Sequence, residues 1–497
     1  MDDSGQDSVM KRVRDYIEAT PRSITLYDID LTPRYSNIHP TEVDLSTRIG
    51  SMRLHVPIFG APMDTVTDPT LAKALSVIGA CGILYRHPDA AVQLAWAKEV
   101  LEYQWCIVKE PITLRDTASI DDARRILHEK GYSTIPVLDE HARLSGVLFT
   151  HDVAFKRHLN DPVSKWMMPI DRLKTEWVGT SFKKIQDRLL HEQECSVLPI
   201  IGGERRLHGM YFMKDVMHAH PSRYAGKPVV GIAIGVSEKD AHERARKAYE
   251  LGASVVVIDS SHGDCTDVVE QTKRVRSLCQ SITIIAGNVA DVTGEGYLHL
   301  AHAGADAIKV GIGSGSICTT TTHTGAGVGM VTAIRACVEA RKLLGAEFKG
   351  RFPSIIADGG INQPGDAVKA LLVGADAVMA GKWLVAASES RSAITRGITP
   401  DGKILYRGMA SKEAIADRSA DRYGKKKKAA EGVSGFVQHR GRLIEWIQED
   451  LELMRSGFAH AGAENITALH QYGNQPGSWS RYSSLGRQQA SVRVDTE

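Results

Sequence analysis

One cysteine stands where its thiol can do chemistry. Cys318 follows the glycine- and serine-rich stretch "GIGSGSI", which starts at Gly311 and comes directly after "DAIKV" (306–310), a short apolar run typical of a buried strand. Backbone amides and hydroxyls around the sulfur favour the thiolate, which is the nucleophilic form. Thr319 and Thr320 supply hydroxyls that can relay a proton. The stretch therefore predicts a nucleophile, with a packed cysteine or a metal ligand as the alternatives.

Other polar and glycine residues also follow apolar runs along the chain. They are Met63 and Asp64, Asp259 and Ser260, Asn288, 313–320, 358–360, and Gly381 with Lys382. The glycines of "GIGSGS" and "ADGG" let backbone amides approach a ligand closely, and a concave surface of this kind suits a phosphate. A single glycine-rich loop is a weak sign, so the prediction depends on a fold that brings the loops together.

Alternating strand-like and helix-like segments supply such a fold. Short apolar runs that close on Gly, Asp, Asn or Ser begin at Pro57, Cys81, Val229, Ser254, Thr283, Asp306, Ser354 and Asp376. Between most of them lie segments with apolar residues at helical spacing, such as 238–252 and 362–374. This alternation predicts an α/β fold, a (β/α)8 TIM barrel, with a doubly wound open sheet as the alternative. In a barrel, the loops that follow the strands share one face.

An internal duplication interrupts the alternation after the second strand. "RLSGVLFTHDV" (143–153) is echoed by "RLHGMYFMKDV" (206–216). The pair resembles a tandem CBS (Bateman) domain, and this resemblance implies that Asp152 and Asp215 bind the ribose of a regulatory nucleotide. The alternative is that both carboxylates only cap the helix that follows.

The chain is expected to divide at these features. The predicted parts are a polar N-terminal segment (1–22), the first part of the barrel (23–104), the tandem CBS domain (105–220), the remainder of the barrel (221–470) and a tail rich in Ser, Gly and Gln (471–497). Within the barrel, residues 408–441 are polar, glycine-bounded and basic in the middle. Such a composition is typical of a mobile loop.

Composition narrows the classes of function. The 497 residues are 43% hydrophobic, and 61 basic against 59 acidic residues give a formal charge of +2. This balance favours neither nucleic acid nor a membrane surface as a partner. Because the sequence has no secretory leader, no apolar run of bilayer length and no C-terminal peroxisomal tripeptide, we expect a cytoplasmic protein. The seven cysteines form no CxxC pair that would suggest zinc.

Several motifs together carry a family resemblance. In order along the chain they are "EVDLSTRI", "APMDTVTD", "VIDSSHG", "AGNV", "VGIGSGSICTT", "ADGGI", "YRGMAS" and "AAEGVSG". From about Ser23 to His470, the sequence resembles the IMP dehydrogenase and GMP reductase family, and the duplicated segment occupies the place of the family's CBS domain.

The resemblance implies a role for each matching residue. Cys318 would attack C2 of a bound purine nucleotide, with Thr320 beside it and with Arg422 and Tyr423 of the loop activating water. The substrate would be bound by Met63, Ser316, Asp358, Gly360, Gly381, Lys382, Tyr406, Met409 and Glu431. The nicotinamide cofactor would face Asp259, Ser260, Asn288 and Gly311. Carbonyl groups of Gly313, Gly315 and Cys318 would hold a potassium ion.

Three functions remain open from the sequence. The leading one is oxidation of IMP to XMP with NAD, because the pair Arg422–Tyr423 is typical of IMP dehydrogenases. The alternative is a GMP reductase that uses NADPH and releases ammonia. The third is a catalytically silent nucleotide sensor, which the altered stretch "TTTTHTGAGVGM" (319–330) suggests, where Gly329 and Met330 replace a Pro-Gln pair. A further departure is Lys382, which replaces a serine and can hold a phosphate as a point charge. The resemblance also implies a homotetramer, which CBS domains binding adenine or guanine nucleotides can join into an octamer.

Overall fold

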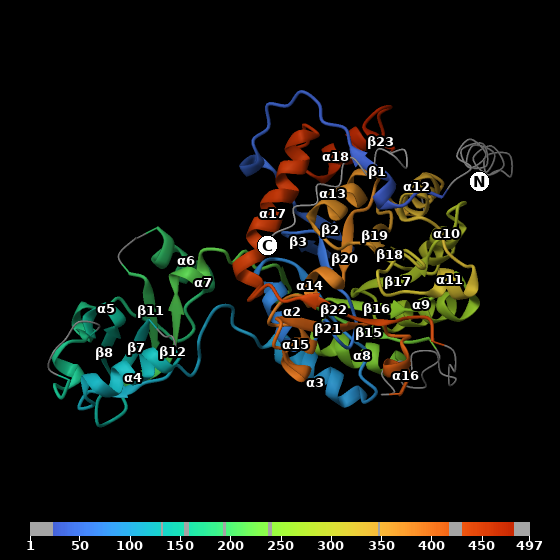
Figure 1. The fold of residues 1–497 in the computed structure, drawn as a ribbon. Coiled ribbons are helices and arrows are strands. Elements are labelled where there is room, and N and C mark those ends of the chain that lie inside the picture. The colour runs from blue at the N-terminus through green and yellow to red at the C-terminus, as the bar shows by residue number, and fades with distance from the viewer. Residues whose placement is uncertain are drawn as a thin grey trace. The chain divides into compact units, whose positions relative to one another are not determined.

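The computed structural model describes residues 23–130, 133–153, 159–191, 195–236, 241–345, 348–416 and 430–481. The chain divides into two compact units (Figure 1). Unit 1 contains 1–103 and 220–497, and unit 2 contains 104–219. None of the helices that the structure describes is long and apolar enough to cross a membrane.

Unit 1 is built on a closed barrel of parallel strands. In spatial order they are β4 (Ile58–Gly60), β5 (Cys81–Leu84), β15 (Val230–Ile234), β16 (Val255–Asp259), β17 (Thr283–Val289), β18 (Ala307–Val310), β19 (Ser354–Asp358) and β20 (Ala377–Ala380). The barrel closes where β20 pairs with β4, with Val378 opposite Ile58. The predicted TIM barrel is therefore confirmed, and the open doubly wound sheet is excluded. Each strand lies within one of the apolar runs identified in the sequence.

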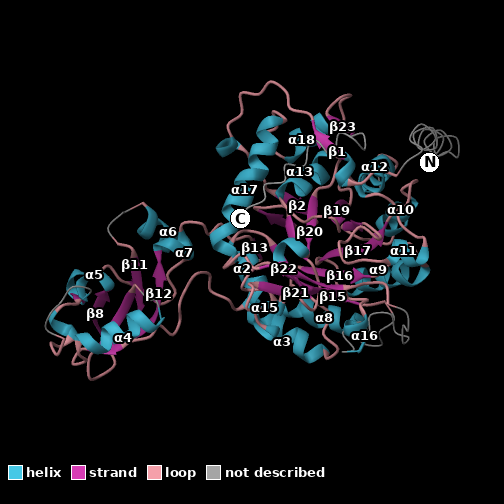
Figure 2. Ribbon diagram, viewed as in Figure 1, coloured by secondary structure: helices cyan, strands magenta, loops and turns pink. Residues whose placement is uncertain are grey.

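Helices surround these strands (Figure 2). The longer ones are α2 (Pro69–Val77), α3 (Ala90–Leu101), α8 (Ala241–Leu251), α9 (Thr266–Leu278), α10 (Glu295–His302), α12 (Met330–Arg341), α13 (Pro364–Leu372), α17 (Leu443–His460) and α18 (Ile466–Gly473). The shorter ones are α11 (Thr320–Thr324), α14 (Lys382–Val385), α15 (Arg391–Arg396) and α16 (Lys412–Ala416). Two-stranded sheets join β1 (Ile29–Leu31) to β23 (Trp479–Arg481), β2 (Thr47–Ile49) to β3 (Met52–Leu54), β13 (Arg223–Tyr224) to β14 (Lys227–Pro228), and β21 (Lys403–Arg407) to β22 (Ser434–Gln438).

The strands are buried on both faces, which explains their continuous apolar sequences. In β16, Val255 and Val257 belong to the cluster inside the barrel, whereas Val256 and Ile258 pack in the outer cluster with the helices. The same alternation places Ala307 of β18 inside and Ile308 outside. Because side chains alternate along a strand, Asp259 and Lys309 extend the inward-facing rows to the end of the barrel that carries the loops.

Unit 2 contains two hairpins that match the duplication in the sequence. The first joins β7 (Thr134–Leu138) to β8 (Leu144–Phe149), and the second joins β11 (Val197–Ile201) to β12 (Leu207–Phe212). Pro136 pairs with Val147, and Pro199 pairs with Met210 at the corresponding position. The other elements are β6 (Leu114–Arg115), β9 (Met168–Pro169), β10 (Glu176–Trp177), α4 (Ile120–Lys130), α5 (Thr150–Val153), α6 (Phe182–Leu190) and α7 (Met213–Val216). The duplication is therefore one of structure as well as sequence.

The aspartates at the ends of the two hairpins lie in short helices. Asp215 stands inside α7, whose N-cap residue is Phe212, and Asp152 falls within α5. The side chain of Asp152 is outside the described part of the structure. Asp215 therefore lies in the first turn of α7 and not at its N-cap position. Nucleotide binding by Asp152 and Asp215 stays a prediction.

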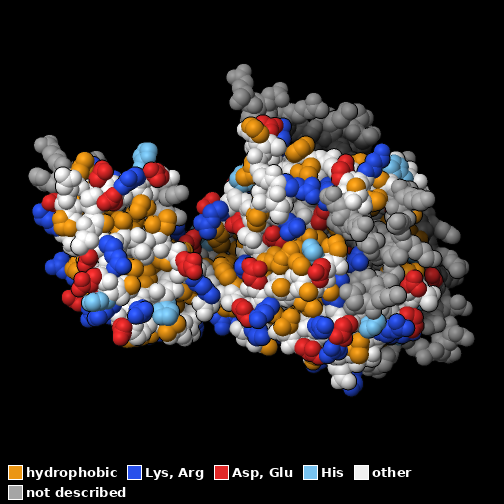
Figure 3. Space-filling view, turned by 90° about the horizontal axis from the view of Figure 1, so that it is seen from below, with side chains coloured by type: hydrophobic (Ala, Val, Ile, Leu, Met, Phe, Trp, Pro, Cys, Tyr) orange, Lys and Arg blue, Asp and Glu red, His pale blue; other side chains and the backbone are white. Residues whose placement is uncertain are grey.

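The surface carries both signs of charge. Lys and Arg side chains are interspersed with Asp and Glu side chains over the face seen in Figure 3. The distribution agrees with the near-neutral net charge of the sequence.

Candidate active site

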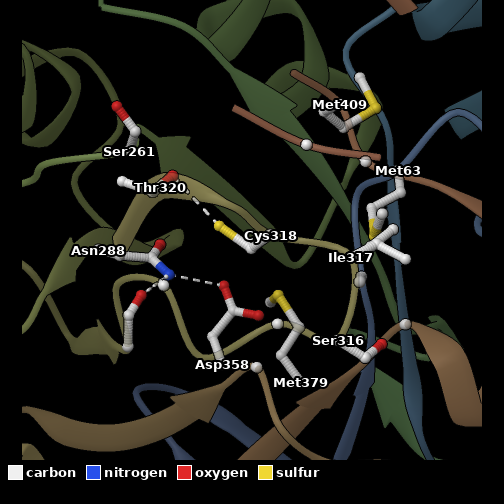
Figure 4. A pocket seen from close by; sticks show the side chains of 18 of the residues that line it. Met63, Ser261, Asn288, Ser316, Ile317, Cys318, Thr320, Asp358, Met379 and Met409 are labelled. Carbon is white, nitrogen blue, oxygen red and sulfur yellow. Dashed lines mark hydrogen bonds between the residues drawn. The ribbon is translucent and has the colours of Figure 1, made fainter. Parts of the chain in front are cut away.

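A pocket lies at the carboxyl ends of the barrel strands. Residues that end or follow β4, β16, β17, β18, β19 and β20 contribute to its wall, together with the segments after β21 and before β22. Figure 4 shows the side chains of Cys318, Thr320, Asn288 and Asp358 at this pocket. The loops that were separate in the sequence therefore converge, as a barrel requires.

The pocket gathers the predicted residues of unit 1 that the structure describes. Those lining it are Met63, Asp259, Ser260, Asn288, Gly311, Gly313, Gly315, Ser316, Cys318, Thr320, Asp358, Gly360, Gly381, Lys382, Tyr406, Met409 and Glu431. Two further predicted residues, Arg422 and Tyr423, lie outside the described residues. The pocket also includes residues that the sequence did not single out, among them Lys309, Ser261, Asn362 and Met379.

A chain of hydrogen bonds starts at the cysteine. The thiol of Cys318 donates to Thr320 Oγ1 at 3.2 Å, and the Thr320 hydroxyl donates to Glu431 Oε2, also at 3.2 Å. A carboxylate is an acceptor, so this arrangement provides a path for the thiol proton. The resemblance implied that Glu431 binds the substrate, whereas in the structure its carboxylate accepts a hydrogen bond from the hydroxyl beside the sulfur.

Backbone pairing brings Glu431 to this position. The Thr319 amide donates to the Glu431 carbonyl at 3.0 Å, and the Val433 amide donates to the Ile317 carbonyl at 3.0 Å. Cys318 and Gly432 thereby form an isolated antiparallel bridge. The cysteine loop and the segment before β22 are thus held together by main-chain hydrogen bonds that do not depend on side-chain identity.

Two glycines of the cysteine loop are required by the chain's own packing. Gly313 has a φ of +75°, and a Cβ there would lie 1.8 Å from Thr321 Oγ1. A Cβ on Gly311, whose φ is +138°, would lie 2.1 Å from the Asp358 carbonyl oxygen. From the sequence, these glycines were expected to let backbone amides approach a phosphate closely. The structure gives a further reason, because no larger residue fits at either position.

A polar cluster forms the floor of the pocket. Asn288 Nδ2 donates to Asp358 Oδ2 at 2.9 Å and to the Gly311 carbonyl at 2.8 Å. Asn288 Oδ1 is buried and has no hydrogen-bond partner. A buried acceptor left without a donor is costly, so this oxygen is placed to receive an N–H or O–H group from a ligand. The donor and acceptor set formed by Asn288, Asp259 and Ser260 fits the hydroxyls or the carboxamide of a nicotinamide nucleotide.

The pocket also carries a cation that has no ion pair among the described residues. Among the described pocket residues, the charged side chains are Asp259, Asp358, Glu431, Lys309 and Lys382. Lys309 is bound to two carboxylates, whereas Lys382 is exposed and forms no ion pair within the described part of the chain. Lys382 directly follows Gly381, where a Cβ would meet Tyr406 Oη at 2.6 Å. The ammonium group is therefore available to an anion.

Tyr406 forms part of the same wall in a protonated state. Its hydroxyl donates to Met63 Sδ at 3.7 Å. Burial and the nearby Asp358 and Cys318 raise the pKa of its phenol well above the usual value. Tyr406 thus presents a neutral hydroxyl to the pocket at physiological pH.

A buried ion pair lies next to the pocket residues Met63 and Tyr406 in the sequence. The Arg407 guanidinium contacts Asp64, with Arg407 Nε 3.0 Å from Asp64 Oδ2, and both side chains are almost fully buried. The Asp64 amide donates to Met409 Sδ at 3.2 Å. This contact links the loop after β4 to the segment after β21, and each carries a predicted binding residue.

The departures at Gly329 and Met330 have a structural explanation. A Cβ on Gly329 would lie 2.3 Å from the Ile24 carbonyl oxygen, because the chain near Ser23 runs against this turn. The Val331 amide donates to the Ile24 carbonyl at 3.0 Å. Met330 is buried beside Gly311, and neither departure lines the pocket. These substitutions therefore leave the pocket wall unchanged and weaken the argument for a silent sensor.

The proposed potassium ligands lie in one turn. Gly313, Gly315 and Cys318 share the loop after β18, and carbonyl oxygens are suitable ligands for a hard cation. The Gly315 carbonyl already accepts the Cys318 amide at 3.0 Å. A carbonyl oxygen has two lone pairs, so this hydrogen bond leaves one for a cation. Binding of potassium stays a prediction.

Comparisons with known proteins agree with the geometry. The family model described as "IMP dehydrogenase / GMP reductase domain" matches residues 23–490. Inosine-5'-monophosphate dehydrogenase of Escherichia coli is 34% identical over 95% of both chains, and that of Aquifex aeolicus is 34% identical over 90% of this chain and 91% of its own. A crystal structure of a GMP reductase variant from Trypanosoma brucei, with a cysteine replaced by alanine and with guanosine 5'-monophosphate bound, is 28% identical. It covers 96% of this chain and 98% of its own, with a TM-score of 0.65. The resemblance read from the motifs is confirmed: the chain belongs to the IMP dehydrogenase / GMP reductase family of oxidoreductases.

Proposed function

We propose that this protein oxidises IMP to XMP with NAD, through a covalent adduct on Cys318. The observation that carries the proposal is the hydrogen-bonded path Cys318–Thr320–Glu431. This path lies in a pocket that the Lys382 side chain also lines. The path gives a thiol that can lose its proton, and the cation suits a nucleotide phosphate. The two curated relatives described above are both IMP dehydrogenases, which supports the same direction of reaction.

The residues have distinct roles in this reaction. The sulfur of Cys318 bonds to C2 of IMP as its proton passes to Thr320 and Glu431. NAD held by Asp259, Ser260, Asn288 and Gly311 would supply the acceptor for the hydride that leaves C2. The purine is then a thioimidate on the sulfur, and water adds to C2 as the carbon–sulfur bond breaks. Overall, IMP, NAD and water give XMP, NADH and one proton. We assign activation of this water to Arg422 and Tyr423.

The subsites follow from the lining of the pocket. We assign the phosphate to Ser316, Gly360, Gly381 and Lys382, and the nucleotide hydroxyls to Asp358. Met63, Tyr406 and Met409 border the base. We assign the cofactor to Asp259, Ser260, Asn288 and Gly311, because the unpaired acceptor of Asn288 requires a ligand donor.

A second candidate, GMP reductase, is favoured by two specific observations. The Thr320–Glu431 pair can also deliver a proton to a departing amine, because Thr320 lies next to the sulfur that attacks C2. In addition, the similarity to the GMP reductase structure extends over nearly the whole of both chains. In this reaction GMP loses ammonia to form the thioimidate, and hydride from NADPH then gives IMP.

Two assays distinguish the candidates. The full-length protein is incubated with IMP and NAD and, separately, with GMP and NADPH, while the absorbance of the reduced nicotinamide is followed. The Cys318→Ala variant is the control for both. The proposal predicts formation of NADH from IMP. Consumption of NADPH with GMP and no reaction with IMP would assign the protein to the second candidate, and silence in both would favour a sensor.

An Arg422→Ala variant tests the hydrolytic half of the reaction. If Arg422 activates water, a burst of NADH equal to the enzyme should remain while steady-state XMP release falls by a factor on the order of 100. Lys426→Ala, in the same basic segment of sequence, is the matched control. Unchanged turnover in Arg422→Ala would remove the arginine from the mechanism.

Unit 2 has a separate proposed role. We assign its duplicated hairpins to the binding of adenine or guanine nucleotides, with Asp152 and Asp215 as ribose acceptors. Light scattering with and without each nucleotide tests whether binding changes a tetramer into an octamer. The Asp152→Ala/Asp215→Ala variant should lose the nucleotide effect and keep the activity of unit 1.

A further inference from the structure

Lys309 occupies an unusual place for a charged residue. It lies in β18, in register with Gly287 of β17 and Ile356 of β19. Ala307, two residues earlier on the same face, belongs to the cluster inside the barrel. The Lys309 side chain is only 2% exposed. In the sequence it is one residue of a short apolar run and carries no sign of a function.

The ammonium group joins two carboxylates from different strands. Lys309 Nζ lies 2.7 Å from Asp259 Oδ1 at the end of β16 and 2.9 Å from Asp358 Oδ2 at the end of β19. Asp259 lies on the side of the pocket assigned to the cofactor, and Asp358 on the side assigned to the substrate. Lys309, which itself lines the pocket, therefore connects the two subsites.

The contacts leave one oxygen of Asp358 facing the ligand. Asp358 Oδ2 receives both Lys309 Nζ and Asn288 Nδ2, which are 2.9 Å away in each case. Among the described residues, no donor reaches Asp358 Oδ1. With one oxygen fixed by two donors, the carboxylate plane is held and its second oxygen is left for a ligand; Figure 4 shows the hydrogen bond from Asn288 to Asp358.

Stability of the barrel does not explain a lysine here. Burial disfavours the charge, although the attraction of Asp259 and Asp358 outweighs burial and raises the pKa of Lys309. A buried ion pair in a barrel core is often no more stabilising than apolar residues of similar volume. The neighbouring interior positions are apolar, so a methionine would serve packing equally well if the two carboxylates had no function.

We propose that Lys309 is a positioning residue that holds Asp358 for the nucleotide and ties it to Asp259 on the cofactor side. The inference rests on the proposed function, since it takes a purine nucleotide as the ligand of Asp358. The Lys309 ammonium group is bound to the Asp259 and Asp358 carboxylates. Its effect on nucleotide affinity must therefore act through the orientation of Asp358.

A double-mutant cycle tests this directly. The equilibrium Kd of IMP is measured by calorimetry, without nicotinamide, for the full-length wild type, Lys309→Met, Asp358→Asn and the double variant. Loss of a charged hydrogen bond predicts that each single change weakens binding about 10-fold or more. If Lys309 acts through Asp358, the double variant binds IMP about as well as Asp358→Asn alone. The proposal would be overturned if the loss of IMP affinity in the double variant equalled the product of the two single losses. A Lys309→Met variant that binds IMP like wild type would also overturn it.

A second variant covers the risk that two facing carboxylates prevent folding. In Lys309→Met/Asp259→Asn, the repulsion between Asp259 and Asp358 is removed, so the midpoint of thermal unfolding should return toward wild type. The affinity for IMP should stay about 10-fold weaker, because Asp358 still lacks its donor. Recovery of full IMP affinity in this variant would show that charge balance alone matters and would refute positioning.

The wild-type measurements separate this inference from the proposed function. IMP binding with no turnover of NAD or NADPH would refute the proposed function and leave the cycle interpretable. Failure of both IMP and GMP to bind the wild-type protein would refute both proposals.

Discussion

Thr320 and Glu431 are 111 residues apart in the chain, yet the Thr320 hydroxyl donates to the Glu431 carboxylate at 3.2 Å. The hydroxyl also accepts the Cys318 thiol, so the threonine stands between an acid and a base. Because the carboxylate is the final acceptor, protons can leave the sulfur without crossing open solvent. The pair therefore connects the nucleophile to a group that can store its proton.

Replacement of Thr320 tests this connection. Thr320→Val keeps the shape of the side chain but removes the hydroxyl, so we expect kcat to fall by a factor on the order of 100 to 10,000. Thr320→Ser retains the hydroxyl and should keep most of the activity. Steady-state kinetics with saturating nucleotide give the comparison, and equal activity of the valine and serine variants would exclude the relay.

Lys382 should determine affinity for the phosphate. Lys382→Ala removes the unpaired cation of the pocket, and the loss of one charged hydrogen bond is expected to raise KM for IMP by about 10- to 100-fold with a smaller change in kcat. The affinity for inosine, which lacks phosphate, should not change. An equal effect on IMP and inosine would show that Lys382 acts on the pocket and not on the phosphate.

The buried pair Asp64–Arg407 should contribute to folding. Asp64→Asn removes the carboxylate that contacts the Arg407 guanidinium, and breaking a buried pair in this way costs about 3–5 kcal/mol in the free energy of unfolding. The double change Asp64→Leu/Arg407→Met removes both charges and should cost much less. Denaturant unfolding measures both, provided that the slope with denaturant stays constant. A double variant as unstable as Asp64→Asn would argue against an electrostatic cause.

The barrel was predictable because its strands are buried on both faces. Runs such as "SVVVID" (254–259) have no polar alternation, and each ends in residues that favour a turn. The loops after these strands converge in any closed parallel barrel. The predicted site residues on those loops, including Asp358 and Cys318, therefore line one pocket once the fold is known.

The partners of these residues were not predictable. Glu431 reaches Thr320 only because main-chain hydrogen bonds join two distant loops, and pairing of this kind leaves no signal in side-chain spacing. Lys309 was not singled out, because the run "DAIKV" (306–310) indicates a short buried strand but not which groups its lysine contacts. A signal was nevertheless present: the other central residues of "DAIKV" are apolar, as in a strand buried on both faces, so its lysine should be buried as well. Gly329 appeared to alter the site, whereas close contact with Ile24 explains it.

The proposed reaction requires the sulfur of Cys318 to bond to C2 of a bound purine nucleotide. It is tested most directly by treating the protein with a purine nucleotide that carries an electrophilic leaving group and mapping the modified peptide by mass spectrometry, with Cys318→Ser as the control. We expect one adduct, on Cys318, that excess IMP prevents and that is absent from the serine variant. Labelling that spares Cys318, or turnover that survives in Cys318→Ser, would contradict it.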